Sequence, residues 1–241
     1  MGKRGKRYEE ASKGIEPGKE YHPLQAVQMV KEHEVSRFDA TIEVHFRLGV
    51  DVRHAEQQLR GTISLPNGTG GDVTVAVFAQ GDLARDAEEA GADIVGGDDL
   101  ATKIQEGFSD FDVVIAAPDM MGVVGKLGRV LGPQGKMPNP KSGTVTQDVA
   151  TAVTEIKAGK IEYRTDRTGI VHLAIGKKSF GTQQLAENYQ AVLDEITRQK
   201  PASAKGRYFR SITLCQTQGP GVPVDSNVTA AEVFEEETEA A

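Results

Sequence analysis

The most constraining feature of this 241-residue sequence is a change of pattern in its middle. Between residues 71 and 158, short apolar segments at 73–78, 94–95 and 113–116 alternate with helical segments at 82–90, 98–105 and 119–131. Strands that alternate with helices of this length predict βαβ units and a parallel sheet that helices cover on both faces. An irregular loop at 132–143 and a helix over 148–158, capped by Asp148, complete this block.

The segments on either side have a different pattern, in which apolar and polar residues alternate. Residues 41–48 (TIEVHFRL) predict a half-buried strand, and further strands are expected at 61–65, 161–165, 170–175 and 208–217. The first twenty or so residues are interpreted as a mobile basic arm. Helices are expected at 23–33 and at 183–198. The simplest architecture is an α+β domain built from residues 1–70 and 159–225, into which an α/β domain of residues 71–158 is inserted.

Both crossings between these domains contain glycine. Gly68, Gly70 and Gly71 lie on the first crossing and Gly159 on the second. Because glycine adopts backbone angles that other residues avoid, these positions predict a hinge between two domains.

Charge is distributed unevenly along the chain, although the total is −7. Residues 1–70 and 159–224 carry +1 and +5, whereas residues 71–158 carry −7. A nucleic-acid partner would therefore bind the domain made from both ends, because local charge decides such binding. The −6 of residues 225–241 predicts an acidic, disordered tail over 226–241. No segment resembles a signal peptide or a membrane helix, so the expected location is the cytoplasm.

The residues offer little for catalysis. The GTGG at 68–71 precedes a strand, and the GVVGKLG at 122–128 lacks the Ser or Thr of a phosphate loop. Cys215 is the single cysteine and is interpreted as a small buried strand residue, and the five histidines have no metal-ligand spacing. We therefore expect no enzyme activity, no cofactor and no metal site. Two interpretations of the 132–143 loop, with Lys136 and Lys141, stay open: a structural lid and a contact surface.

Several long motifs resemble the ribosomal protein L-one family in its bacterial form. The strongest is MMGVVGKLGRVLGPQGKMPNP at 120–140. RFDATIEVHFRLGVD at 37–51, RGTISLPNGTG at 60–70, VAVFAQG at 75–81, DVVIAAPD at 112–119, KSGTVTQDVATAV at 141–153 and QGPGVPVD at 218–225 follow the same family pattern. The resemblance covers about residues 3–225 in order, and it implies a Rossmann-like inserted domain.

The resemblance also implies a function and partners. Members of the family bind large-subunit ribosomal RNA at the mobile side stalk near the tRNA exit site, help tRNA release, and repress translation by binding their own operon mRNA. We therefore expect a ribosome-bound, cytoplasmic RNA-binding protein that is a monomer within the ribosome. Two competing hypotheses are a nucleotide-dependent enzyme, for which no phosphate loop is present, and a protein-interaction module, which leaves the charge distribution unexplained.

The resemblance further implies which residues contact RNA. They lie in three segments of the basic blocks: Arg37, Phe38 and Thr41; Asp166, Arg167 and Gly169; and Thr217, Gln218, Gly219 and Pro220. Physically, a threonine hydroxyl and a glycine N–H can reach ribose 2′-OH groups and phosphate oxygens. Two departures weaken the match locally, because the family usually has Met at the position of Gln218 and Lys or Arg at that of Gly71.

Overall fold

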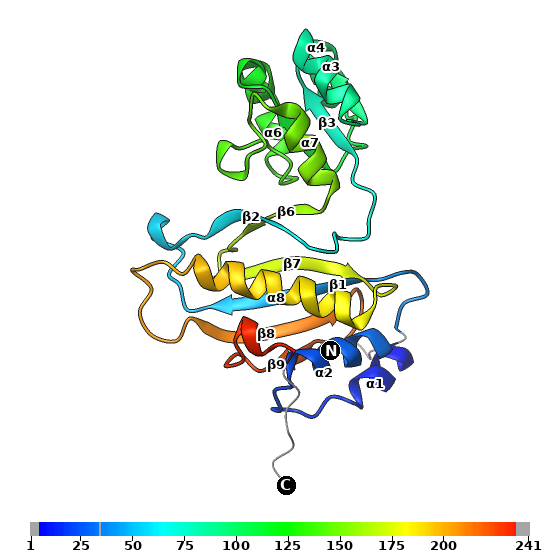
Figure 1. The fold of residues 1–241 in the computed structure, drawn as a ribbon, viewed down its shortest axis with the longest axis vertical. Helices are drawn as coiled ribbons and strands as arrows, with labels where there is room; N and C mark the ends of the chain where they lie inside the picture. The colour runs from blue at the N-terminus through cyan, green and yellow to red at the C-terminus, as the bar shows by residue number, and fades with distance from the viewer. Residues whose placement is uncertain (1–4, 34, 235–241) are drawn as a thin grey trace. The chain divides into compact units, whose positions relative to one another are not determined.

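The computed structural model describes residues 5–33 and 35–234, which form two compact units. The split unit comprises Met1–Gly70 and Tyr163–Ala241, and the inserted unit comprises Gly71–Glu162 (Figure 1). The second division falls within strand β6 (Lys160–Arg164), whereas the sequence pattern had placed it at 158/159.

The split unit is built on a four-stranded antiparallel sheet with the order β7-β1-β8-β9. Its strands are β1 (Thr41–Leu48), β7 (Ile170–Lys177), β8 (Phe209–Gln216) and β9 (Val222–Val224). Helices α2 (Pro23–Glu32) and α8 (Thr182–Arg198) pack against this sheet and against each other. The alternating residues of β1 explain the arrangement, because one set is buried: Ile42, Val44, Phe46 and Leu48.

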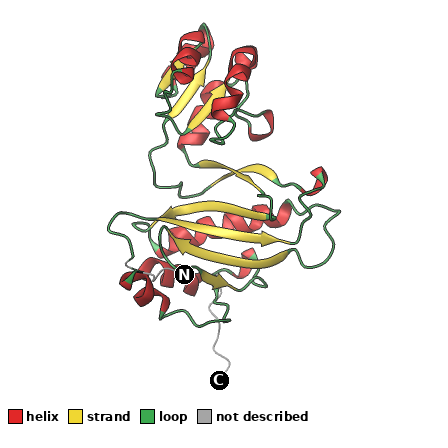
Figure 2. Ribbon diagram, turned by 180° about the vertical axis from the view of Figure 1, so that it is seen from behind, coloured by secondary structure: helices red, strands yellow, loops and turns green. Residues whose placement is uncertain are grey.

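Among the described residues, no helix crosses the other face of this sheet. Figure 1 places α8 in front of the strands, and Figure 2, from behind, places the strands in front of the helices. The alternate residues of β1 on this side are half-buried or exposed. We call this side the open face. Strand β2 (Arg60–Ser64) lies outside the sheet and pairs with β6.

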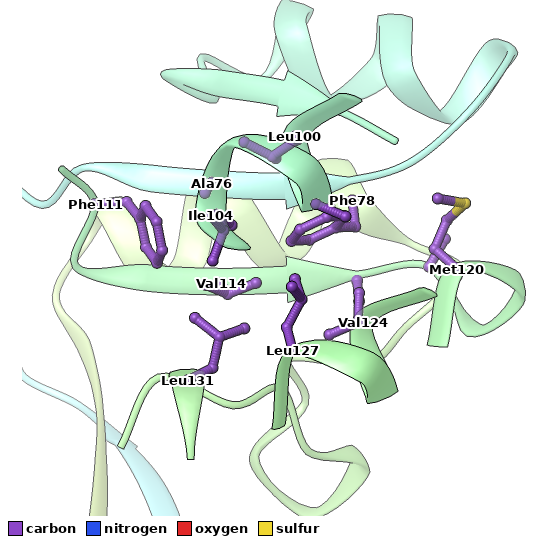
Figure 3. Close-up of a cluster of buried hydrophobic side chains, with 13 residues drawn as sticks. Ala76, Phe78, Leu100, Ile104, Phe111, Val114, Met120, Val124, Leu127 and Leu131 are labelled. Carbon is purple, nitrogen blue, oxygen red and sulfur yellow. The ribbon is translucent and has the colours of Figure 1, made fainter. Parts of the chain in front are cut away.

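The inserted unit contains a three-stranded parallel sheet with the order β4-β3-β5. The strands are β3 (Val75–Phe78), β4 (Ile94–Gly96) and β5 (Val113–Ala116), and the longer helices are α3 (Asp82–Glu89), α4 (Asp98–Gln105) and α7 (Val149–Lys157). One apolar cluster joins the sheet to α4 and the segment after β5 (Figure 3), and a second joins it to α3 and α7. Both faces are therefore buried, and the predicted fold class is confirmed.

The helix expected over 119–131 is broken into shorter pieces. They are η2 (Pro118–Met120), α5 (Met121–Val124), η3 (Gly125–Leu127) and α6 (Gly128–Leu131). Glycines at 122, 125 and 128 explain the breaks, because each disfavours a helix by about 1 kcal/mol relative to alanine. The apolar face is kept, since Met120, Val124, Leu127 and Leu131 are all buried (Figure 3).

Both ends of the chain contain more regular structure than the sequence indicated. Helix α1 (Lys6–Ser12) occupies the segment expected to be a mobile arm. After β9, residues expected to begin a disordered tail form η5 (Ala230–Glu232), where Gln190 Nε2 donates to Ala230 O (2.7 Å) and Val233 is fully buried. The rest of the predicted tail, 235–241, lies outside the described residues. Within the described part of the chain, no helix is long and apolar enough to cross a membrane.

Candidate nucleic-acid interface

Two of the three predicted segments meet at one end of the sheet. Thr41 begins β1 and Thr217 directly follows β8. The backbone N–H of Thr217 donates to the carbonyl of Thr41 (2.9 Å), and its hydroxyl donates to the same oxygen (3.2 Å). Lys177 Nζ donates to the hydroxyl oxygen of Thr41 (2.9 Å). Two hydroxyls and an ammonium group are thus gathered at the edge of the open face.

Arg37 and Phe38 extend this end of the sheet. Phe38 is 53% exposed, so it is not part of the hydrophobic core. The neighbouring Asp39 accepts hydrogen bonds from the Ser179 hydroxyl (2.7 Å) and N–H (3.0 Å). The hydroxyl bond is the main reason why the pKa of Asp39 is lowered. Phe38 is therefore an exposed aromatic ring on a segment whose next residue, Asp39, is hydrogen-bonded to the loop between β7 and α8.

The turn after β8 has a constrained backbone. Gln218 has a φ of 69°, and Gly219 N–H donates to Gln216 O (2.7 Å). A Cβ on Gly221 would lie 2.8 Å from Thr213 Cγ2, so a larger residue here would force the Thr213 side chain to shift. Gln218 is exposed and Gly219 is half-buried, whereas Pro220 is buried. The turn therefore presents Thr217, Gln218 and Gly219 to a ligand, and Pro220 supports it from within.

The third predicted segment, 166–169, lies at the opposite end of the sheet. Gly169 has a φ of 79°, and its carbonyl accepts from Leu48 N–H at the end of β1 (2.9 Å). Asp166 Oδ1 accepts from the N–H groups of Thr168 (2.8 Å) and Ile170 (2.7 Å). Burial opposes ionisation of Asp166, but the Thr168 and Ile170 hydrogen bonds outweigh it and lower the pKa. Asp166 thus shapes the turn, and Arg167 is its exposed cation.

The predicted residues therefore do not form one compact site. The eight residues of β1 separate the two ends, and at ~3.3 Å per residue this is about 23 Å. The open-face side chains of three strands lie between the two ends of the sheet: Glu43, His45, Arg47, His172, Ala174, Ser211, Thr213 and Cys215. None of these residues was predicted to belong to the site. The alternation in TIEVHFRL already placed three of them on a polar face, but the strand pairing that joins them was not visible in the sequence.

Two of the five histidines and the cysteine meet on this face, although their spacing in the sequence does not indicate it. His45 Nδ1 lies 2.8 Å from His172 Nδ1, and His45 Nε2 lies 3.1 Å from Cys215 Sγ. Cys215 is in a strand, as expected, but it is only half-buried. Burial and the adjacent His172 lower the pKa of His45, and burial raises the pKa of the Cys215 thiol.

The 132–143 loop belongs to the inserted unit, and its two lysines differ. Lys136 Nζ donates to the backbone carbonyl of Phe111 and lies 4.9 Å from the centre of that ring. Lys141 is exposed within η4 (Pro140–Ser142). The contacts of Lys136 support the lid interpretation for the part of the loop that it anchors.

A split α+β unit that carries an inserted parallel-sheet unit defines a class of two-domain α/β proteins. Comparison with known proteins specifies the family. Residues 30–220 match the family described as "Ribosomal protein L1p/L10e family". A protein of Thermobifida fusca (strain YX) named "Large ribosomal subunit protein uL1" is 58% identical over 227 residues, which cover 94% of this chain and 97% of the relative.

The chain therefore belongs to the ribosomal protein L1p/L10e family. This confirms the resemblance drawn from the motifs. The family consists of structural ribosomal proteins and not of enzymes, so the hypothesis of a nucleotide-dependent enzyme is excluded.

Proposed function

We propose that this chain binds large-subunit ribosomal RNA through the open face of the split unit and the segments at its two ends. The observation that carries the proposal is the uncovered polar face that joins Thr41 and Thr217 at one end to Arg167 at the other. The name of the Thermobifida fusca relative supports the large subunit as the destination. In this proposal the inserted unit contributes no essential RNA contact, in agreement with its −7 charge.

The chemistry of the face fits a folded RNA. Phe38 offers an exposed ring on which a base can stack, and Arg37, Arg47 and Arg167 offer guanidinium groups for phosphates. The Thr41 and Thr217 hydroxyls keep free lone pairs that can accept a hydrogen bond from a ribose 2′-OH. A contact to 2′-OH groups favours RNA over DNA of the same sequence.

The direct test is the affinity of the purified full chain for a large-subunit rRNA fragment. Phe38→Ala should weaken binding by about 1–3 kcal/mol, because base stacking on one aromatic ring contributes this much. Phe234→Ala is the matched control, since Phe234 is also exposed (41%) but lies after η5. Equal losses in the two variants would contradict the placement of the interface.

The dependence of the affinity on salt concentration, and on ribose instead of deoxyribose, provides an independent check. If four to six phosphates are neutralised, log K should fall against log salt with a slope of about −3 to −5. The DNA version of the fragment should bind more weakly, and equal affinity for DNA would overturn the 2′-OH contacts.

The finer functions follow from the same surface. We infer that the chain is a monomer at the mobile side stalk of the cytoplasmic ribosome, helps tRNA leave the exit site, and represses its operon by binding its own mRNA. If one surface serves both RNAs, a leader fragment of the operon mRNA should compete with the rRNA fragment. Simultaneous binding of both fragments to one chain would exclude this shared site.

A further inference from the structure

The open face carries a group of metal-ligand side chains that are not among the RNA contacts named above. One ligand atom from each of Glu43, His45 and Cys215 lies within 4.8 Å of the other two. All three side chains are half-buried, so water and ions can reach them. The strand register brings them together: Glu43 and His45 are two residues apart on one face of β1, and Cys215 on β8 pairs with Glu43.

The distances are close to those of a tetrahedral zinc site. Zinc–nitrogen and zinc–sulfur bonds of ~2.0 and ~2.3 Å place the two ligand atoms about 3.5 Å apart. His45 Nε2 and Cys215 Sγ are 3.1 Å apart, and His45 Nε2 and Glu43 Oε2 are 3.9 Å apart. With ~2.0 Å bonds to nitrogen and oxygen the second pair would lie about 3.3 Å apart, so the two pairs depart from zinc geometry by about 0.4 and 0.6 Å. Rotation of the side chains, with the Glu43 carboxylate moving furthest, would seat an ion among these three atoms.

The other nitrogen of His45 is held as in metal-binding histidines. His45 Nδ1 lies 2.8 Å from His172 Nδ1, and His172 Nε2 lies 3.7 Å from Asp166 Oδ2. If His172 carries its proton on Nε2, toward Asp166, its Nδ1 accepts the proton of His45 Nδ1. That tautomer leaves the Nε2 lone pair of His45 directed at Cys215. Such outer hydrogen bonds orient ligating imidazoles in known metal sites.

We propose that Glu43, His45 and Cys215 bind a divalent transition-metal ion of the zinc type, with His172 as the positioning residue. Carboxylate, imidazole and thiolate together form a ligand set that zinc accepts, and three protein ligands leave a fourth position open to water or another donor. In the metal-free protein the Cys215 thiol donates its hydrogen to His45 Nε2. The ion replaces that hydrogen: a metal–sulfur and a metal–nitrogen bond form, and one proton is released to solvent.

Cobalt(II) titration of the full chain, without RNA and with a phosphine reductant, tests this site. Because Cys215 is the single cysteine, any thiolate-to-cobalt absorption band reports on this residue alone. We expect the band to saturate at one ion per chain and to disappear when zinc is added. No band, or a band that zinc leaves unchanged, would overturn the proposal.

Variants separate the site from unspecific binding. Cys215→Ser should abolish the band, and His45→Gln or the milder Glu43→Gln should weaken cobalt binding at least tenfold. His172→Ala should weaken it about 10–100-fold, as outer-sphere changes do. The matched control His54→Gln, at an exposed histidine before η1 (Ala55–Gln57), should leave it unchanged. An undiminished band in both His45→Gln and Glu43→Gln would contradict the ligand set, whichever variant folds better.

The outcome is independent of the proposed RNA function. The titration contains no RNA, and the rRNA affinity is measured separately in the presence of a chelator. Loss of the band with intact RNA binding would overturn only the metal site, and failure of RNA binding with an intact band would overturn only the RNA proposal.

Discussion

The two main sheets of this protein differ in how many of their faces are covered. In the inserted unit, apolar clusters bury both faces of the parallel sheet β4-β3-β5. In the split unit, α2 and α8 cover one face of β7-β1-β8-β9, and the other face keeps polar side chains in reach of solvent. Parallel sheets are usually covered twice and antiparallel sheets often once. The difference explains why a broad ligand surface is available on the split unit and not on the strands of the inserted unit.

The largest expected effect is on the stability of the doubly covered sheet. Ile115 on β5 is fully buried, so Ile115→Ala should lower the free energy of unfolding of the inserted unit by about 2–5 kcal/mol. RNA affinity of the folded chain should not change, because Ile115 belongs to the inserted unit, which is proposed to make no essential RNA contact. Urea unfolding followed by circular dichroism, with rRNA binding measured on the same sample, checks both results. A parallel loss of affinity at full folding would mean that the inserted unit takes part in binding.

A smaller effect on stability is expected from substitutions at the first crossing between the two units. Gly70 has a φ of 72°, and a Cβ there would lie 2.5 Å from Phe180 Cε1, whereas a Cβ on Gly71 would meet nothing within 4 Å. Gly70→Ala should therefore destabilise the split unit by about 1–3 kcal/mol. Gly71→Ala, the matched variant, should be nearly neutral. Thermal unfolding of both variants tests this difference, and equal melting temperatures would show that Gly70 is not constrained as described.

The comparison of Gly70 with Gly71 is also relevant to the predicted hinge. Gly68 and Gly159, with φ values of 65° and 102°, have the left-handed backbone that favours glycine, as Gly70 does. We propose that these glycines and Gly71 allow the units to move. Gly71 is the better residue for testing that motion, since its substitution disturbs no packing.

The split unit also contains a buried side-chain amide, that of Gln216, which should reduce its stability. The Gln216 side chain is 1% exposed, and within the described residues neither its Oε1 nor its Nε2 has a hydrogen-bond partner. Gln216→Met keeps the length of the side chain and removes both polar atoms, so it should raise stability by about 1 kcal/mol. Gln190→Met is the control, because Gln190 donates to Ala230 O and should lose stability. A destabilised Gln216→Met would reveal a partner for the amide, such as a bound water.

The smallest effect is a difference in pH dependence. All five histidines lie outside residues 71–158, and burial lowers the pKa of His33 and His45 below 6.5. The folded split unit therefore binds fewer protons than its unfolded form, and its stability falls as the pH drops through about 6.5. The inserted unit should show no such histidine-dependent loss between pH 7 and pH 5. Unfolding curves at both pH values, for the parent and for His33→Gln, test this, and an unchanged slope in the variant would exclude His33 as a cause.

Much of the fold follows from local sequence patterns. The expected segments 41–48, 98–105 and 113–116 agree with β1, α4 and β5, because alternation and helical periodicity are local properties. The break of the 119–131 helix was missed because its apolar spacing hides the cost of three glycines. The ordered segment 230–233 could not be predicted because the tail 226–241 that contains it is rich in glutamate, while the burial of Val233 depends on tertiary packing.

The candidate site was harder to predict. The motifs predicted the contact residues that lie at the two ends of the sheet. The approach of His45 to His172 and Cys215, in contrast, depends on strands that are more than 120 residues apart in sequence. Pairing between distant strands is set by the whole core and not by spacing within a motif. The sequence therefore indicated a polar face on β1 without revealing which residues lie beside it.

The most direct test of the RNA surface is Thr217→Val, measured for stability and for rRNA affinity on one sample. Thr217 N–H still donates to Thr41 O when the hydroxyl is removed, so stability should change by less than about 1 kcal/mol. RNA affinity should fall by about 1–3 kcal/mol, because an RNA group loses its partner. Thr154→Val on α7, whose hydroxyl also donates to a backbone carbonyl, should leave affinity unchanged. Parental affinity in Thr217→Val would contradict the placement of the RNA contact at this end of the open face.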